Sequence, residues 1–189
     1  ITAPAVTVVG DVVRYRDALR WFDNRPLFGK TVLVTRAREQ ASALSKALRT
    51  RGARAVEFPV FEIAPPDDGF AALDDAVARL GDFRWCAFAS RNAVDALFAR
   101  LDAAGKDARA FGGVRIAAVG EATADALRAR GLRPDFVPAE AVAEALAGLP
   151  DPDLAGAQIL LPRAADTRGV LEAAWEKAGA RVASVEAYR

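Results

Sequence analysis

The sequence predicts an α/β protein with two similar domains, each built on a parallel sheet flanked by helices. First, short apolar stretches alternate strictly with helical stretches from residue 31 onward, which is typical of parallel sheets covered by helices. Second, one β-α-β pattern occurs twice. Third, the segment 65–69 (PPDDG) predicts a linker between two halves, because proline and glycine interrupt regular structure.

The two copies of the repeat begin with the segments 32–36 (VLVTR) and 159–163 (ILLPR). A helical stretch comes after both segments, and Gly-Ala-Arg begins 16 residues after each arginine, at Gly52 and at Gly179. An extended strand comes after each glycine. Two alternatives stay open: a single domain with two half-units, and a chance likeness, since any two β-α-β units look alike in sequence.

The first 30 residues differ from the rest of the chain. The β-branched run 6–13 predicts a strand, and the mixed stretch 15–23 predicts a short amphipathic helix. Pro26 cannot continue that helix and Gly29 permits a turn, so this region is interpreted as an appendage followed by a linker.

From residue 31 onward, short apolar runs predict strands, and apolar residues spaced three or four apart, such as Leu44 and Leu48, predict helices. The predicted strands are 31–35, 56–63, 85–89, 115–119, a short one near Phe136, 158–161 and 182–188. The predicted helices are 39–49, 70–80, 92–101, 122–130, one from Glu140, and 167–178.

Composition excludes several classes of function. With 189 residues, 52% of them hydrophobic, the chain can bury a sizeable core. Its 26 basic and 25 acidic residues form no basic run, which argues against nucleic-acid or membrane-surface binding. The absence of histidine excludes a Ser-His-Asp triad and a histidine-ligated metal within this chain, and the single cysteine, Cys86, excludes a disulfide or a CxxC metal site.

The apolar runs and the amino terminus of the sequence predict where the protein resides. No apolar run approaches the roughly 20 residues that span a bilayer, and no signal peptide is evident, so we expect a cytoplasmic protein. The sequence contains no methionine and begins with Ile1, which suggests a piece of a longer polypeptide.

Candidate binding residues follow the predicted strands, because ligands of parallel sheets bind beyond the carboxyl ends of the strands. Hydroxyl groups, glycine and arginine beside helix starts favour anions, and several such places together could bind a polyanion. The residues at these ends are Arg36, Ser90, Arg91, Gly120, Thr123 and Arg163. Plainer roles stay open: the hydroxyls could cap helices, the arginines could be solvated or paired, and Gly120 could serve the turn. Tyr188 ends a strand, either as a structural residue or as a proton donor.

Five segments together resemble the uroporphyrinogen-III synthase family. They are 29–36 (GKTVLVTR), 88–94 (FASRNAV), 118–124 (AVGEATA), 160–163 (LLPR) and 185–189 (VEAYR). Residues 1–28 resemble instead the carboxyl end of uroporphyrinogen-III C-methyltransferase. This second resemblance implies an upstream methyltransferase domain in the same polypeptide.

The synthase resemblance implies an enzyme that closes hydroxymethylbilane into uroporphyrinogen III, losing water and inverting the last pyrrole ring, without metal or cofactor. It also implies two α/β domains joined by two extended strands, 56–66 and 182–189. A tail would occupy 1–28, the split first domain 29–63 and 183–189, and the second domain 64–182. Because the family continues for about half a domain more, the first domain is expected to be incomplete and the fragment alone inactive.

Transferred residue by residue, the resemblance makes Tyr188 catalytic, as hydrogen-bond donor or general acid toward the leaving hydroxyl. Ser90 and Thr123 match positions that contact substrate carboxylates, and Arg36, Arg91, Gly120 and Arg163 lie in matching motifs near the cleft. The alternatives are a non-enzymatic module that senses a tetrapyrrole or another polyanion, part of a bifunctional methyltransferase-synthase, and a plain flavodoxin-like domain.

Overall fold

The computed structural model describes residues 5–167 and 169–189. The chain divides into two compact units, 1–63 and 64–189. No helix in the described residues is both long enough and apolar enough to cross a membrane.

The first unit contains one β-α-β motif. Strand β1 (Thr31–Val34) pairs in parallel with β2 (Arg54–Glu57), and helix α2 (Arg38–Thr50) connects them. The motif confirms the first copy of the predicted repeat. Several large apolar side chains of this unit are exposed to solvent, among them Leu33, Phe58, Val60 and Phe61. A two-stranded sheet with so much exposed apolar surface has little stability of its own.

The predicted strand 6–13 is wrong. Residues 5–9 have no regular structure, and η1 (Asp11–Tyr15) is a 3₁₀ helix that begins after Gly10, whose φ is 121°. A strand needs a neighbour for its backbone hydrogen bonds, and none of the described strands lies beside this segment. The predicted helix 15–23 is only α1 (Arg16–Leu19), with no buried residue.

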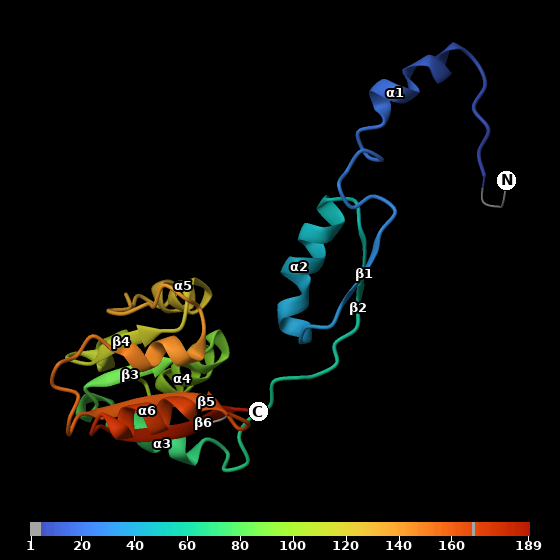
Figure 1. The fold of residues 1–189 in the computed structure, drawn as a ribbon. Coiled ribbons are helices and arrows are strands. Elements are labelled where there is room, and N and C mark those ends of the chain that lie inside the picture. The colour runs from blue at the N-terminus through green and yellow to red at the C-terminus, as the bar shows by residue number, and fades with distance from the viewer. Residues whose placement is uncertain (1–4, 168) are drawn as a thin grey trace. The chain divides into compact units, whose positions relative to one another are not determined.

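The second unit contains a four-stranded parallel sheet in the order β4-β3-β5-β6. Its strands are β3 (Trp85–Phe88), β4 (Arg115–Ala118), β5 (Gln158–Ala164) and β6 (Arg181–Tyr188). Its helices are α3 (Ala71–Ala78), α4 (Arg91–Ala103), α5 (Glu121–Ala129) and α6 (Val170–Lys177), with 3₁₀ segments η2 (Leu80–Asp82), η3 (Ala108–Phe111) and η4 (Ala143–Gly148). The parallel α/β prediction is confirmed, and β5-α6-β6 is the second copy of the repeat (Figure 1).

Two predicted elements of this unit differ from the structure. The strand near Phe136 is a single bridge to Ala117, and the helix from Glu140 is the 3₁₀ segment η4. Pro134 and Pro138 flank the bridge and cannot donate backbone hydrogen bonds, which limits its extension.

A hydrophobic core lies on each face of this sheet, because successive strand residues point to opposite faces. Cys86, Phe88 and Leu160 belong to the core beneath α3, α4 and α5, here called the α4 face. Trp85, Ala87 and Leu161 belong to the core beneath α6 and η4, here called the α6 face. Helices and 3₁₀ segments thus cover the sheet on both faces, which supports the strands whose ends are described below.

A buried carboxylate secures the amino end of the sheet. The side chain of Asp151 is 0% exposed and accepts hydrogen bonds from Arg84 at Nε (2.6 Å) and Nη2 (2.8 Å). It also accepts from the indole Nε1 of Trp85 (2.7 Å) and the backbone N–H of Asp153 (3.1 Å). The hydrogen bond from Arg84 is the main cause that holds the pKa of Asp151 well below its usual range. Asp151 therefore ties its loop to the start of β3.

The first and last residues of the second unit lie side by side. The backbone N–H of Ala64 donates to the carbonyl of Arg189 (2.8 Å), and the N–H of Arg189 donates to the carbonyl of Ala64 (3.0 Å). This reciprocal pair is the pattern of antiparallel strands. The side chain of Arg189 also pairs with Asp67. Strand β6, predicted to cross back to the first domain, pairs with β5 over residues 181–188.

Candidate functional site

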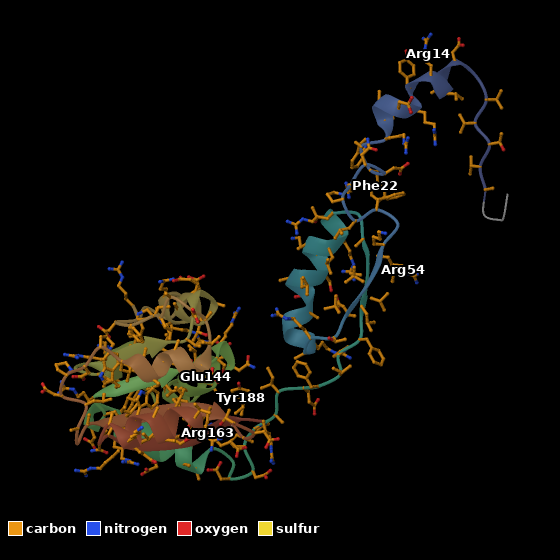
Figure 2. All side chains as sticks on the ribbon, in the orientation of Figure 1. Arg14, Phe22, Arg54, Glu144, Arg163 and Tyr188 are labelled. Carbon is orange, nitrogen blue, oxygen red and sulfur yellow. The ribbon has the colours of Figure 1, made fainter. Side chains whose placement is uncertain are left out.

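The carboxyl ends of the four parallel strands meet at one edge of the second unit's sheet. Tyr188 ends β6, Arg163 lies near the end of β5, Ser90 follows β3 and Gly120 follows β4. Figure 2 shows the labelled Arg163 and Tyr188 close together at the end of this unit where β5 and β6 finish. The position agrees with the edge at which parallel sheets bind ligands.

Ser90 and Tyr188 are in direct contact. The Ser90 Oγ and Tyr188 Oη atoms are 2.9 Å apart, although 98 residues separate them in the chain. Ser90 is also the N-cap of α4, where its Oγ accepts the backbone N–H of Ala93 (3.1 Å). Both side chains are partly exposed. Two of the predicted site residues thus form one pair of hydroxyl groups, held in place by a helix cap.

Arg163 is engaged within the protein. Its Nε donates to Ser184 Oγ (2.5 Å), and its Nη1 donates to the carbonyls of Ala164 and Ala165 and to Thr167 Oγ1. Glu172 lies 3.2 Å from its Nε and accepts the hydroxyl of Ser184 at 2.7 Å. The guanidinium therefore organises the loop after β5, with only part of its surface left for a ligand.

A cavity of about 410 Å³ lies beside this arginine. Its walls are mainly apolar and include Ala89, Val142 and Leu161, while Arg163 and Glu172 supply polar groups. The sequence gives little indication of the segment 142–144 or of Glu172, because neither lies at a predicted strand end nor in a recognised motif. Both lie within predicted helices, the one from Glu140 and the one over 167–178.

The other predicted residues have different surroundings. Thr123 is only 4% exposed, so its hydroxyl is not presented to solvent, and the backbone at Gly120 is buried. A Cβ on Gly120 would lie 2.8 Å from the Cβ of Ala141. A glycine at this position therefore lets the chain at Ala141 pass close to the end of β4. Arg91 is exposed and lies 3.6 Å from Asp95. Arg36 is exposed in the first unit.

The chemistry available at this edge is that of hydroxyl groups and a guanidinium. In residues 5–167 and 169–189, no group of three or more histidine, cysteine or carboxylate side chains could hold a metal ion. Cys86 is fully buried, and desolvation raises the pKa of its thiol well above the usual value, so the thiolate nucleophile is disfavoured. The Ser90–Tyr188 pair is the group suited to proton donation.

A family model and curated relatives match this chain. Residues 42–189 match the family model described as uroporphyrinogen-III synthase HemD. A uroporphyrinogen-III synthase of Synechococcus elongatus is 41% identical over 166 residues, which are 87% of this chain and 62% of that protein. A uroporphyrinogen-III C-methyltransferase of Bacillus subtilis is 31% identical over 101 residues, which are 53% of this chain and 20% of that protein.

The fold comparison agrees. The crystal structure of a mutant uroporphyrinogen III synthase from Thermus thermophilus matches with a TM-score of 0.63 at 22% identity, over 85% of this chain and 62% of that one. The chain thus spans about three fifths of the length of these two synthases. On the family model and the Synechococcus relative, this chain belongs to the uroporphyrinogen-III synthase (HemD) family.

Proposed function

We propose that this chain is part of an enzyme with the activity of its family, which cyclises hydroxymethylbilane to uroporphyrinogen III, with loss of water and inversion of the last pyrrole ring. The observation that supports this best is the Ser90–Tyr188 hydroxyl pair at the ligand-binding edge of a family member. This is a step of tetrapyrrole biosynthesis, and we place it in the cytoplasm. The alternative is a non-enzymatic tetrapyrrole sensor of the same fold, and a coupled assay distinguishes it from the synthase.

In the proposed mechanism, Tyr188 donates its proton to the hydroxyl of the substrate's hydroxymethyl group. The C–O bond then breaks, water leaves, and the electron pair of the adjacent pyrrole nitrogen compensates the developing cation. The methylene cation bonds to the α carbon of the last pyrrole that already carries its bridge, the older bridge bond breaks, and the freed methylene bonds to the other α carbon of that ring. Loss of the proton from that carbon, with return of a proton to Tyr188, completes a redox-neutral reaction. General-acid assistance of this kind contributes roughly 10²–10⁴-fold to a rate. Holding the flexible chain in a curled form supplies much of the remainder.

The substrate is a polycarboxylate, which fits exposed arginines better than buried groups. Arg91 begins α4 beside Ser90 and is 68% exposed at its side chain, so we assign it a substrate carboxylate. Arg36 has the same proposed role in the first unit. Thr123, Gly120 and Arg163 support the site without binding a carboxylate in this proposal. Thr123 is buried, Ala141 lies close to Gly120, and the guanidinium of Arg163 is bonded within the protein.

We also propose that the first domain is split in sequence, that 64–182 form the second domain, and that 183–189, which pair with β5 in the second unit, form the strand that crosses back to the first domain together with 29–63. The reciprocal hydrogen bonds between Ala64 and Arg189 support two antiparallel crossing strands. The exposed apolar side chains of the first unit favour a larger sheet there. For residues 1–28 we propose a methyltransferase partner in the same polypeptide. The support is that a protein named uroporphyrinogen-III C-methyltransferase is 31% identical to this chain over 101 residues, a match that extends beyond 1–28.

A coupled assay tests the function. Freshly generated hydroxymethylbilane is supplied, and the type I and type III products are separated. Two proteins are compared: residues 1–189, and a chimaera that joins them to the part of the Synechococcus elongatus synthase outside the alignment. We expect type III product from the chimaera and only the spontaneous type I isomer from the 189-residue chain.

The tyrosine variants supply the control. Tyr188→Phe in the chimaera should lower type III formation by about 100-fold or more. The matched variant Tyr15→Phe changes the only other tyrosine, which lies in the first unit, and should leave it unchanged. If a folded chimaera binds the bilane but yields only type I product, the sensor replaces the synthase.

A further inference from the structure

The side chains of β6 alternate regularly until its carboxyl end. Ala183, Val185 and Ala187 pack into the core on the α4 face. Val182 packs into the core on the α6 face, and Ser184 on that face bonds Glu172 of α6. Continued alternation would place Tyr188 on the α6 face as well, away from Ser90.

The pairing of β6 with β5 contains one extra residue at this point. Arg163 pairs with Glu186, but the next residue of β5, Ala164, pairs with Tyr188. Ala187 therefore has no partner on β5, which is the arrangement of a β-bulge. After the bulge the alternation is reversed. Tyr188 packs against the core on the α4 face and brings its Oη to 2.9 Å from Ser90 Oγ.

We propose that the bulge at Ala187 is the device that delivers the Tyr188 hydroxyl to Ser90, and that Ala187 and Ser90 are positioning residues for Tyr188. The inference rests on the proposed function, because it concerns how the proton donor of that reaction is aimed. Bulges commonly re-aim a side chain beside an active site.

The residue at the bulge suits this role. Two consecutive side chains, those of Ala187 and Tyr188, pack on the same face, so the first of them has to be small. Ala187 is 0% exposed, so a larger side chain there would have to displace packed neighbours. Ser90 supplies the fixed end of the pair, because its Oγ accepts the N–H of Ala93 at the start of α4. A helix cap and a strand bulge thus hold the two hydroxyls together.

On the α6 face, Tyr188 would contact different side chains. There Arg163, Ser184 and Glu172 already bond to one another, with distances of 2.5 Å, 2.7 Å and 3.2 Å. A phenol placed among them would compete for acceptors that are in use. The bulge therefore separates the proton donor from this ion pair and faces it toward a neutral hydroxyl.

The test measures the coupling of Tyr188 to Ser90 without requiring turnover. In a Tyr15→Phe background Tyr188 is the only tyrosine, so incorporated 3-fluorotyrosine yields one fluorine resonance that reports on it. Ser90→Ala should shift this resonance, and Ser90→Thr, which keeps both hydroxyl and cap, should shift it much less. In a variant with one alanine inserted into β5 after Arg163, Ala187 gains a partner and the bulge is removed. Regular alternation then places Tyr188 on the α6 face, so Ser90→Ala should have no effect.

Two results would overturn the inference: no effect of Ser90→Ala in the intact chain, or the same effect after the insertion. If the insertion variant does not fold, the intact chain decides. Nuclear Overhauser contacts from the Tyr188 ring to the Ser90 β protons are expected, and contacts to Ser184 instead would refute the geometry.

The activity readout separates this inference from the function on which it rests. In the chimaera, the insertion after Arg163 and Tyr188→Phe should each reduce kcat, and together they should reduce it no further than Tyr188→Phe alone. Spectroscopic coupling combined with full type III production by Tyr188→Phe would reject the proposed function of Tyr188. A loss of activity in Tyr188→Phe without spectroscopic coupling would reject only the role of the bulge.

Discussion

Replacing Asp151 with asparagine tests how strongly one buried carboxylate secures the second unit. The substitution keeps the size of the side chain but turns one acceptor oxygen into a donor that faces other donors. Arg84 reaches Asp151 at 2.6 and 2.8 Å, and the Trp85 indole reaches it at 2.7 Å. Asparagine cannot accept all of these hydrogen bonds.

The expected cost follows from these contacts. A hydrogen bond to a charged group contributes about 1.5–3 kcal/mol, and a buried donor left without an acceptor costs about 1–3 kcal/mol. The Arg84 side chain is 38% exposed, so water replaces part of what it loses. We therefore expect the free energy of unfolding at pH 7 to fall by about 2–4 kcal/mol.

The effect should depend on pH in a defined direction. The pKa of Asp151 is lowered in the folded state, so its contribution is complete above the pKa of the unfolded state, about 3.9. The contribution is lost as the pH falls below that value. The difference in stability between wild type and Asp151→Asn should therefore shrink as the pH is lowered from about 5 toward 2.

Urea unfolding followed by tryptophan fluorescence measures this. In a Trp21→Phe background, Trp85 and Trp175 report on the second unit alone. The matched control is Asp153→Asn, whose carboxylate is 80% exposed and 3.7 Å from Arg84, and which should change stability by less than about 0.5 kcal/mol. Equal effects of the two substitutions, or an Asp151 effect of the same size at pH 7 and pH 2.5, would refute the reasoning.

Three further outcomes are expected. Gly120→Ala should lower the melting temperature, because the new Cβ would lie 2.8 Å from the Cβ of Ala141. The control Gly148→Ala, whose Cβ meets no atom within 4 Å, should leave it unchanged, and thermal unfolding of the two variants measures the difference. The thiol of Cys86 should resist a disulfide reagent in the native protein and react fully in denaturant, since it is buried and its pKa is raised; a fast native reaction would contradict this. Arg163→Lys should accelerate amide hydrogen exchange in 164–167 and leave exchange in α4 unaltered, because lysine cannot reproduce the several contacts of the guanidinium.

Much of the second unit could be predicted from sequence because its strands are buried on both faces. A buried strand such as β3 consists of a continuous apolar run, and the helices that follow have apolar residues at helical spacing. The run 6–13 is also rich in apolar, β-branched residues, yet it forms no strand. Composition predicts which segments can extend, whereas pairing depends on a neighbouring strand, which a single segment does not reveal.

The candidate site was predicted as a set of positions, and its geometry was not. Ser90 and Tyr188 lie at strand ends that sequence inspection finds, but their contact depends on a one-residue shift between β5 and β6. Such a shift exists only in the pairing of two strands, so the periodicity of β6 alone predicts the opposite face. The Asp151 contacts were missed for a related reason, because more than 60 residues separate it from Arg84.

The reciprocal backbone bonds between Ala64 and Arg189 have a consequence for protein engineering. A compact body whose first and last residues are neighbours can be excised, inserted into a host loop, or circularly permuted without stretching the chain. New termini could be opened at Gly105, an exposed turn with a φ of 67° after α4, while a short linker joins the old ones. The second unit could therefore be moved into another protein with its sheet intact.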